Sequence, residues 1–138
     1  MTEQESGSAP LEIHEITFDA LNPYAAAQFW SELLGRRIRS GDSDAGESVL
    51  VEPTPGQPGL LFMRVPQGKT TKNRVHLDLW PTHTVRDAQI ARALNLGAVL
   101  IADMRRSDGS GWAVLRDREG NEFCIGSSAA ERQARRAR

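Results

Sequence analysis

The chain has 138 residues, of which 39% are hydrophobic and 25% are charged, a balance typical of one globular domain. A net charge of -1 gives no electrostatic reason to expect nucleic acid or an acidic membrane surface as a partner. No apolar run is long enough to span a bilayer and residues 1–10 do not resemble a signal peptide, so we expect a cytoplasmic protein. The single cysteine, Cys124, excludes an intrachain disulfide and suits a reducing compartment.

The first half of the chain predicts a strand followed by a helix. Residues 1–10 lack periodicity and are expected to form a disordered lead. Apolar and polar residues alternate over 11–20, which is typical of a strand with one buried face. Asn22 followed by Pro23 is a strong helix start, because the Asn side chain accepts a free amide and the Pro ring presets φ. The predicted helix ends at Gly35.

Three short strands are expected after this helix, near 36–40, 47–52 and 59–65. Turn-rich stretches that contain glycine, proline and aspartate separate them. The polar segment 66–73 then reads as a linker between two halves of the chain.

The second half repeats this order of elements. The sequence RVHLDLW at 74–80 predicts a strand, and Thr84 with Asp87 three places later resembles a capping box at the start of a helix. This helix is expected to run to Leu96 and to end at Gly97. Three further strands then fit the pattern near 98–104, 112–116 and 121–126.

The two halves align with an offset of 61 residues. This offset sets Glu15 on His76 and Met63 on Cys124. Each half alone would leave one face of a small sheet uncovered, and duplication supplies the missing partner. We therefore predict an α+β fold of two βαβββ modules whose curved sheets carry helices on the outer face and form a cup-shaped ligand site.

The predicted boundaries follow from this arrangement. One domain covers 11–127, with a first module at about 11–66 and a second at about 74–127. Residues 128–138 form a basic C-terminal tail, interpreted as a solvated, frayed terminus, with an interaction arm as the alternative.

Four stretches of the chain carry a resemblance to known proteins: NPYAAAQFWSELLG at 22–35, NRVHLDL at 73–79, LGA at 96–98 and DREGNEFCI at 117–125. In this order they resemble the vicinal oxygen chelate superfamily, which contains glyoxalase I, bleomycin resistance proteins, fosfomycin-modifying transferases and extradiol dioxygenases. Within it the chain is most similar to actinobacterial glyoxalase-like domain proteins. The resemblance covers about residues 11–127 and implies a cup for a small molecule and a homodimer.

The resemblance also implies where a metal would bind. In metal-dependent members the ligands come from the first and last strands of each module, which here are the positions of Glu15, Met63, His76 and Cys124. Met63 is not a ligand for hard or borderline ions, so a site would consist of Glu15, His76 and Cys124, with Glu122 as a substitute carboxylate. This set favours Zn, with Ni, Mn and Fe as further candidates. The alternative is that no metal binds and that Cys124 is a small buried hydrophobe.

The side chains expected around the cup leave more than one function open, and no catalytic residue can be assigned from them. The first hypothesis is a metal-free protein that binds a small organic molecule, as a bleomycin-resistance-type sequestering protein does. The second is a divalent-metal-dependent lyase, isomerase or dioxygenase acting on a substrate with vicinal oxygens. The third is a dimerising domain with a filled cup. The expected cup residues are Met63, Asp78, Trp80, Trp112 and Glu122.

Overall fold

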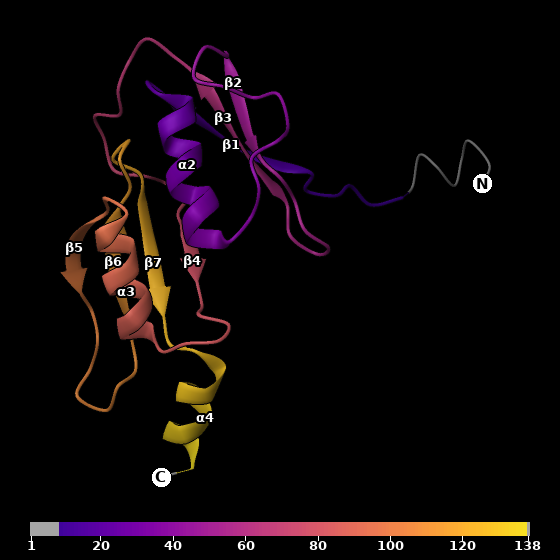
Figure 1. The fold of residues 1–138 in the computed structure, drawn as a ribbon. Helices are drawn as coiled ribbons and strands as arrows, with labels where there is room; N and C mark the ends of the chain where they lie inside the picture. Colours follow the sequence, from indigo (N-terminus) through magenta and orange to yellow (C-terminus); the bar gives the residue numbers. More distant parts are fainter. Residues whose placement is uncertain (1–8, 138) are drawn as a thin grey trace.

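The computed structural model of the chain describes residues 9–137, which form three helices and two small sheets (Figure 1). The disordered lead predicted for residues 1–10 falls almost entirely on residues 1–8, which lie outside the described residues, as does residue 138. Among the described helices, none is both long and apolar enough to cross a membrane.

The first sheet contains three strands in the order β1-β3-β2. Strands β1 (Glu15–Ala20) and β3 (Gly59–Arg64) are parallel, and β2 (Ser48–Val51) is antiparallel to β3. The register sets Phe18 opposite Phe62, and their rings stack with centroids 5.4 Å apart. Phe62 is completely buried, whereas the neighbouring residues of β3 at 61 and 63 face the other side of the sheet.

The second sheet has the same pattern with one strand more, in the order β4-β7-β6-β5. Strand β4 (Leu77–Leu79) is parallel to β7 (Glu122–Gly126), while β6 (Trp112–Arg116) and β5 (Val99–Asp103) continue the sheet in antiparallel fashion. The βαβββ order predicted for the second module is therefore confirmed, and the first module has the same order with one strand fewer.

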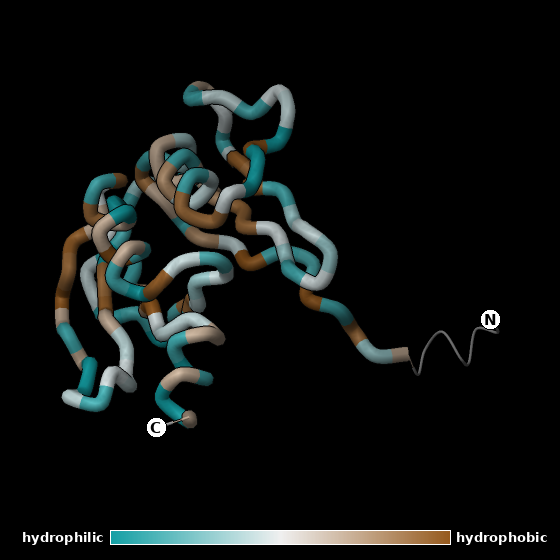
Figure 2. Tube along the Cα trace, turned by 60° about the horizontal axis from the view of Figure 1, so that its bottom comes forward, coloured by the Kyte–Doolittle hydropathy of each residue, from teal (hydrophilic) through white to brown (hydrophobic). Residues whose placement is uncertain are grey.

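Helices cover one face of each sheet and leave the other face open. Helix α2 (Pro23–Leu34) packs on the first sheet and α3 (Arg86–Asn95) on the second, and Figure 1 shows both on the same side of the strands. The Asn22 side chain accepts the amide of Ala25, as the Asn-Pro start predicted. Apolar stretches lie mainly within the strands and helices, whereas the connecting loops are largely hydrophilic (Figure 2).

One core joins the two modules, because α2 also contacts the second sheet. The Trp30 ring lies 4.9 Å from the Phe123 ring of β7, measured between centroids, and 6.4 Å from the Phe18 ring of β1. The Glu119 carboxylate, in the turn before β7, accepts the backbone amides of Leu21 and Asn22. A negative charge at the N-terminus of α2 is favourable for the helix dipole, so the second module stabilises the helix of the first.

The strand expected near 36–40 is reduced to a single bridge between Ile38 and Val51. The side chain of Asp42 explains this difference. Its Oδ2 accepts a hydrogen bond from the backbone amide of Leu50 at 2.8 Å. In a longer strand a backbone carbonyl would accept this amide, so the β-ladder ends early.

The capping box expected at Thr84 and Asp87 does not form. Helix α3 begins after Val85, which makes no side-chain cap. The Thr84 hydroxyl instead accepts a hydrogen bond from the Gln89 side chain. The first amide of the helix, that of Arg86, donates to Glu131 at 2.9 Å, so a residue distant in sequence satisfies it.

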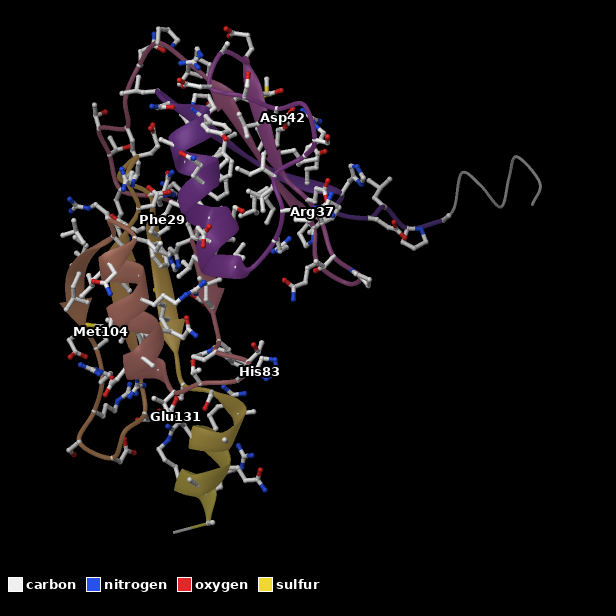
Figure 3. All side chains as sticks on the ribbon, viewed as in Figure 1. Phe29, Arg37, Asp42, His83, Met104 and Glu131 are labelled. Atoms are coloured by element: carbon white, nitrogen blue, oxygen red, sulfur yellow. The ribbon has the colours of Figure 1, made fainter. Side chains whose placement is uncertain are left out.

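The basic segment expected to be a frayed tail forms a third helix, α4 (Ala129–Arg136). Ser128 and Glu131 make a complete capping box, in which each side chain accepts the other residue's amide. Figure 3 places Glu131 between the start of α4 and the start of α3. Because Glu131 also accepts the Arg86 amide, the same carboxylate begins α4 and fixes it to α3.

Candidate functional site

A pocket of about 380 Å³ opens on the uncovered face of the second sheet. Strands β4, β6 and β7 form its floor, and α4 with the loop at 104–111 forms its rim. Side chains of these strands alternate, so Leu77 and Leu79 join the core while Asp78 faces the open side. The volume is within the range of pockets that hold small organic molecules.

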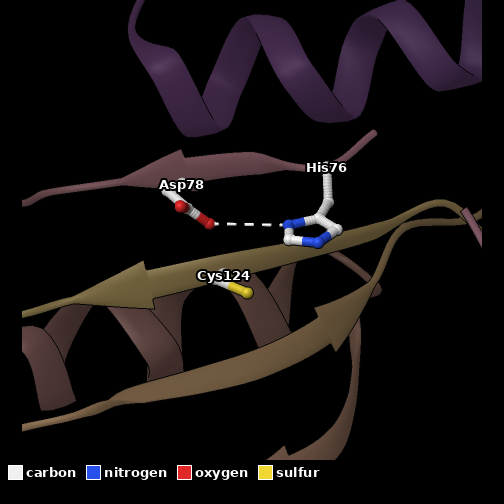
Figure 4. A group of neighbouring side chains, drawn as sticks. All are labelled: His76, Asp78 and Cys124. Carbon is white, nitrogen blue, oxygen red and sulfur yellow. Dashed lines mark ion pairs between the residues drawn. The ribbon is translucent and has the colours of Figure 1, made fainter. Parts of the chain in front are cut away.

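Three potential ligand groups lie together on this floor (Figure 4). Asp78 of β4 is paired with Cys124 of β7, and His76 lies just before β4 on the same face. The His76 Nδ1 and Asp78 Oδ1 atoms are 3.7 Å apart, and ligand atoms of all three residues lie within 4.8 Å of one another. The parallel pairing of β4 with β7 therefore creates the cluster.

The Cys124 thiol is the buried member of this cluster, with 8% of the residue exposed. Burial raises the pKa of Cys124 to about 11, and the negative charge of Asp78 adds to the effect. The thiol is therefore protonated at neutral pH unless a cation lies close to it, and it is a poor nucleophile in that state.

Two tryptophans form the apolar walls of the pocket. The exposed fractions of Trp80 and Trp112 are 63% and 39%, which is high for side chains of this size. The Trp80 indole lies directly on Gly126 of β7, where an added Cβ would come within 3.1 Å of the ring. A glycine at 126 thus permits the close approach of the ring to the strand.

Helix α4 contributes two arginines to the rim. The Arg132 guanidinium lies over the Trp80 ring, 3.7 Å from its centroid, and Arg132 also donates to the Ser127 carbonyl. Arg135 donates to the Gly109 carbonyl at 3.0 Å. The capping at Ser128 and Glu131 therefore positions both guanidinium groups at the pocket.

Hydrogen bonds from Arg86 and a glycine at position 111 fix the loop at 104–111. Arg86, only 6% exposed, donates to the carbonyls of Gly109 and Gly111. Gly111 has φ +96°, and a Cβ there would lie 2.2 Å from the Met104 carbonyl oxygen. Only glycine fits this position, which brings the loop back to Trp112 at the start of β6 and sets Arg106 at the pocket.

A second pocket of about 490 Å³ lies between the two modules. Thr17 and Asp19 of β1 line one side, and Asn73 and Arg74 of the linker region line the other. His76 borders this pocket as well as the first one. The open faces of the two modules are therefore continuous at His76.

Comparison with known families identifies the chain. A family model described as a glyoxalase-like domain matches residues 15–126. The chain belongs to this family. The vicinal oxygen chelate superfamily expected from the sequence is thereby confirmed. No curated protein matches the chain by sequence.

Solved structures of glyoxalase-like proteins share the fold at low sequence identity. A glyoxalase/bleomycin resistance protein/dioxygenase family enzyme from Burkholderia phytofirmans PsJN has a TM-score of 0.66 and 17% identity, over 83% of this chain and 97% of the other. A glyoxalase-related enzyme from Fulvimarina pelagi has a TM-score of 0.61 and 16% identity, over 85% and 88%. A lactoylglutathione lyase from Agrobacterium tumefaciens has a TM-score of 0.59 and 18% identity, over 88% and 96%.

The strand register of this chain corrects the expected equivalence of Glu15 and His76. The register sets Phe18 opposite Phe62 in the first module and Leu77 opposite Phe123 in the second. If Phe62 and Phe123 are equivalent, as the offset of 61 requires, the first strands align with an offset of 59 instead. Thr17 is then the counterpart of His76.

Glu15 accordingly lies outside the cluster of His76, Asp78 and Cys124. Its carboxylate is 3.8 Å from the His14 side chain, near the start of β1. Asp78, predicted only as a cup residue, supplies the carboxylate that the sequence assigned to Glu15.

The other predicted site residues separate into two groups. Asp78, Trp80 and Trp112 line the pocket together with His76 and Cys124. Glu122 lies on the same face as Cys124, but its carboxylate binds Lys72 at 2.6 Å, away from the cluster. This hydrogen bond and the positive charge of Lys72 lower the pKa of Glu122. Met63 lies on the open face of the first sheet, opposite Asp19, and does not line the second-sheet pocket.

The arginines at the rim are the site residues that the sequence analysis missed. Arg132 and Arg135 were counted within the basic tail, and Arg106 was not singled out. The signal that could have found the first two is the Ser128-x-x-Glu131 pattern, which is a capping box in the sequence itself.

Proposed function

We propose that this glyoxalase-like protein binds a small aromatic molecule in the pocket on the second sheet. The observation that carries the proposal is the pair of exposed indoles, Trp80 and Trp112, at one pocket of about 380 Å³. Aromatic contacts of this kind contribute about 0.5 to 1.5 kcal/mol each beyond the burial of apolar area. Sequestration of the ligand, as by a bleomycin resistance protein, is the simplest role for such a pocket.

The protonated state of the Cys124 thiol supports binding over covalent chemistry. Burial, with Asp78 alongside, raises the pKa of the thiol to about 11, so the pocket floor offers a weak donor instead of a nucleophile at neutral pH. His76 and Asp78 then act as hydrogen-bonding groups that orient a polar edge of the ligand.

The three tryptophans of the chain allow a direct test. The indole N–H signals in a nitrogen-15 NMR spectrum are assigned with Trp→Phe variants and followed while small aromatic compounds are added. We expect the signals of Trp80 and Trp112 to shift together and that of Trp30, which is 1% exposed, to stay in place. A Met63→Ala variant serves as a control, since Met63 lies on the other sheet. Compounds that bind without moving Trp80 and Trp112 would contradict the proposal.

A divalent-metal-dependent enzyme is the second candidate, because the donor set fits a metal ion. Zinc bonds of about 2.0 to 2.2 Å to nitrogen and oxygen in a tetrahedral site separate two such ligand atoms by roughly 3.3 to 3.5 Å. The His76 Nδ1 and Asp78 Oδ1 atoms are 3.7 Å apart, so a small movement of the two exposed side chains would bring them to this separation. His76, Asp78 and Cys124 would hold the ion, which would polarise vicinal oxygens of a substrate as a Lewis acid.

Cobalt(II) is the probe that separates this candidate from metal-free binding. If His76, Asp78 and Cys124 hold the ion, the protein takes up one equivalent and shows a thiolate charge-transfer band that disappears in Cys124→Ser. Asp78→Ala then weakens uptake, whereas Glu15→Ala leaves it unchanged. Loss of uptake in Glu15→Ala with retention in Asp78→Ala would instead support the ligand set expected from the sequence.

A further inference from the structure

We infer that the ligand of this pocket carries an anionic group, such as a carboxylate, beside its aromatic ring. The inference rests on the proposed function, since it concerns the same pocket. It is carried by Arg106, Arg132 and Arg135, which all line the pocket. None of the three forms an ion pair with a carboxylate within the described residues 9–137.

Most hydrogen-bond donors of these three arginines are free. A guanidinium has five N–H donors, and each of these side chains makes one hydrogen bond within the described part of the chain. Arg132 donates to the Ser127 carbonyl, Arg135 to the Gly109 carbonyl and Arg106 to the Ser110 hydroxyl. Since all three acceptors are neutral, the positive charges remain available to a ligand.

The Arg132 guanidinium is held in place before any ligand arrives. One side of the group lies on the Trp80 ring at 3.7 Å from the centroid, and the Ser127 carbonyl fixes one nitrogen. Cation–π contact of this kind is favourable by about 0.5 to 1 kcal/mol at an exposed site. A pre-positioned planar fork suits the two oxygens of a carboxylate and loses little entropy when it binds them.

The acidic groups nearby offset only part of this charge. Asp78 lies on the floor of the same pocket. Next to Arg135, the pKa of Asp108 is lowered by hydrogen bonds from the hydroxyl and the amide of Ser110 and, to a smaller extent, by the charges of Arg135 and Arg106. Beneath the loop, buried Arg86 adds a fourth positive charge near Glu131, and its Nε has no hydrogen-bond partner among the described residues.

An aromatic carboxylate matches both the tryptophans and the arginines that line the pocket. Its ring contacts the indoles of Trp80 and Trp112, and its oxygens accept from the guanidinium groups at the rim. An aromatic cation would meet three unpaired positive charges, and a neutral aromatic would leave them unused.

The test compares 2-naphthoate with its neutral isostere 2-naphthamide by isothermal titration calorimetry. We expect 2-naphthoate to bind at least about tenfold more tightly at low ionic strength, and we expect added salt to reduce this preference. Arg132→Gln and Arg135→Gln should bring the affinity for 2-naphthoate close to that for 2-naphthamide. Arg136→Gln removes an equal charge from the same helix but does not line the pocket, and it should leave the preference intact.

The possible outcomes separate the inference from the proposed function. Equal affinity for the two compounds would overturn the inference and leave the aromatic pocket standing. Binding of neither compound, with the Trp80 and Trp112 signals unmoved, would overturn both. If α4 detaches in the Arg135→Gln variant, Arg106→Gln supplies the same test from the loop at 104–111, because Arg106 is outside that helix. A preference unchanged in Arg106→Gln and Arg132→Gln would also overturn the inference.

Discussion

The indole nitrogen of Trp30 donates a hydrogen bond of 2.9 Å to Asp117, which joins α2 of the first module to the turn between β6 and β7 of the second. Both residues are buried, at 1% and 5% exposure. The Asp117 carboxylate also accepts the backbone amides of Glu119 and Asn121 and the Asn121 side chain. These four hydrogen bonds offset the cost of burying the Asp117 carboxylate. The bond from Trp30 also fixes the position of the two modules relative to each other.

Trp30→Phe tests the contribution of this contact. The variant loses a hydrogen bond to a charged group and some packed volume, so we expect the free energy of unfolding to fall by about 2 to 4 kcal/mol. Urea denaturation measures the change. Trp112→Phe makes the same substitution at a partly exposed position and should cost less than about 0.5 kcal/mol. Similar costs for the two variants would show that the contact between the modules is unimportant.

Gly111→Ala and Gly109→Ala separate backbone strain from steric clash in the loop at 104–111. Both glycines have positive φ, at +96° and +87°. A Cβ at position 109 meets only the Arg135 side chain at 3.6 Å, so we expect a cost of about 1 kcal/mol. A Cβ at 111 would overlap the Met104 carbonyl, so we expect at least about twice that cost and weaker ligand binding. Thermal unfolding and calorimetry measure both, and equal costs would refute the clash.

Gly126→Ala should weaken binding without unfolding the protein. The added methyl group would lie 3.1 Å from the Trp80 ring, and this exposed side chain can move away. Displacement of the ring breaks its contact with Arg132, so we expect ligand affinity to fall about fivefold, equivalent to about 1 kcal/mol. Gly68→Ala introduces a contact of 3.3 Å with Leu21, away from the pocket, and is the control. An unmoved Trp80 indole signal in Gly126→Ala would contradict the mechanism.

We expect acid to detach α4 from α3, because protonation of Glu131 weakens its hydrogen bonds to the amides of Ser128 and Arg86. Burial alone would raise the pKa of this carboxyl, but hydrogen bonds from the amides of Ser128 and Arg86 lower it below its ordinary value of 4.5. A lowered folded-state pKa means that the stabilisation is complete above the ordinary value and is lost as the pH falls through the lower folded value. Circular dichroism and the Trp80 indole signal follow the helix during acid titration.

Glu131→Gln is the matched variant for this titration, because the amide oxygen still accepts hydrogen bonds but the side chain does not titrate. We expect α4 in this variant to be somewhat less stable at neutral pH and insensitive to acid over the same range. An acid response that persists in Glu131→Gln would assign the effect to another carboxyl.

Local signals in the sequence were sufficient for most of the fold. The helix start at Asn22 and Pro23 and the alternation along β1 depend on neighbouring residues alone, and both are present in the structure. The strand near 36–40 was wrong because the Asp42 side chain, in the following turn, takes an amide that a longer ladder would use. The cap of α3 was wrong because its partner, Glu131, is 45 residues away.

The candidate site was harder to predict because it depends on register. Side chains in a strand alternate with period two, so a slip of two residues leaves the same face exposed and is invisible in the alternation. The aligned sequences therefore put Glu15 in the position that belongs to Thr17. The pairing of Asp78 with Cys124, which forms the cluster, became visible only with the strands in place. The homodimer and the cytoplasmic location stay predictions.

The contact of Trp30 with aromatic rings from both modules has a consequence for how the protein unfolds. One core contains residues of both halves, so we expect neither half to fold alone. A peptide bond cut within 66–73 should leave two fragments that remain associated, and separated fragments should regain structure only when mixed. We therefore expect denaturant to unfold the two modules in one cooperative transition, in spite of the duplication.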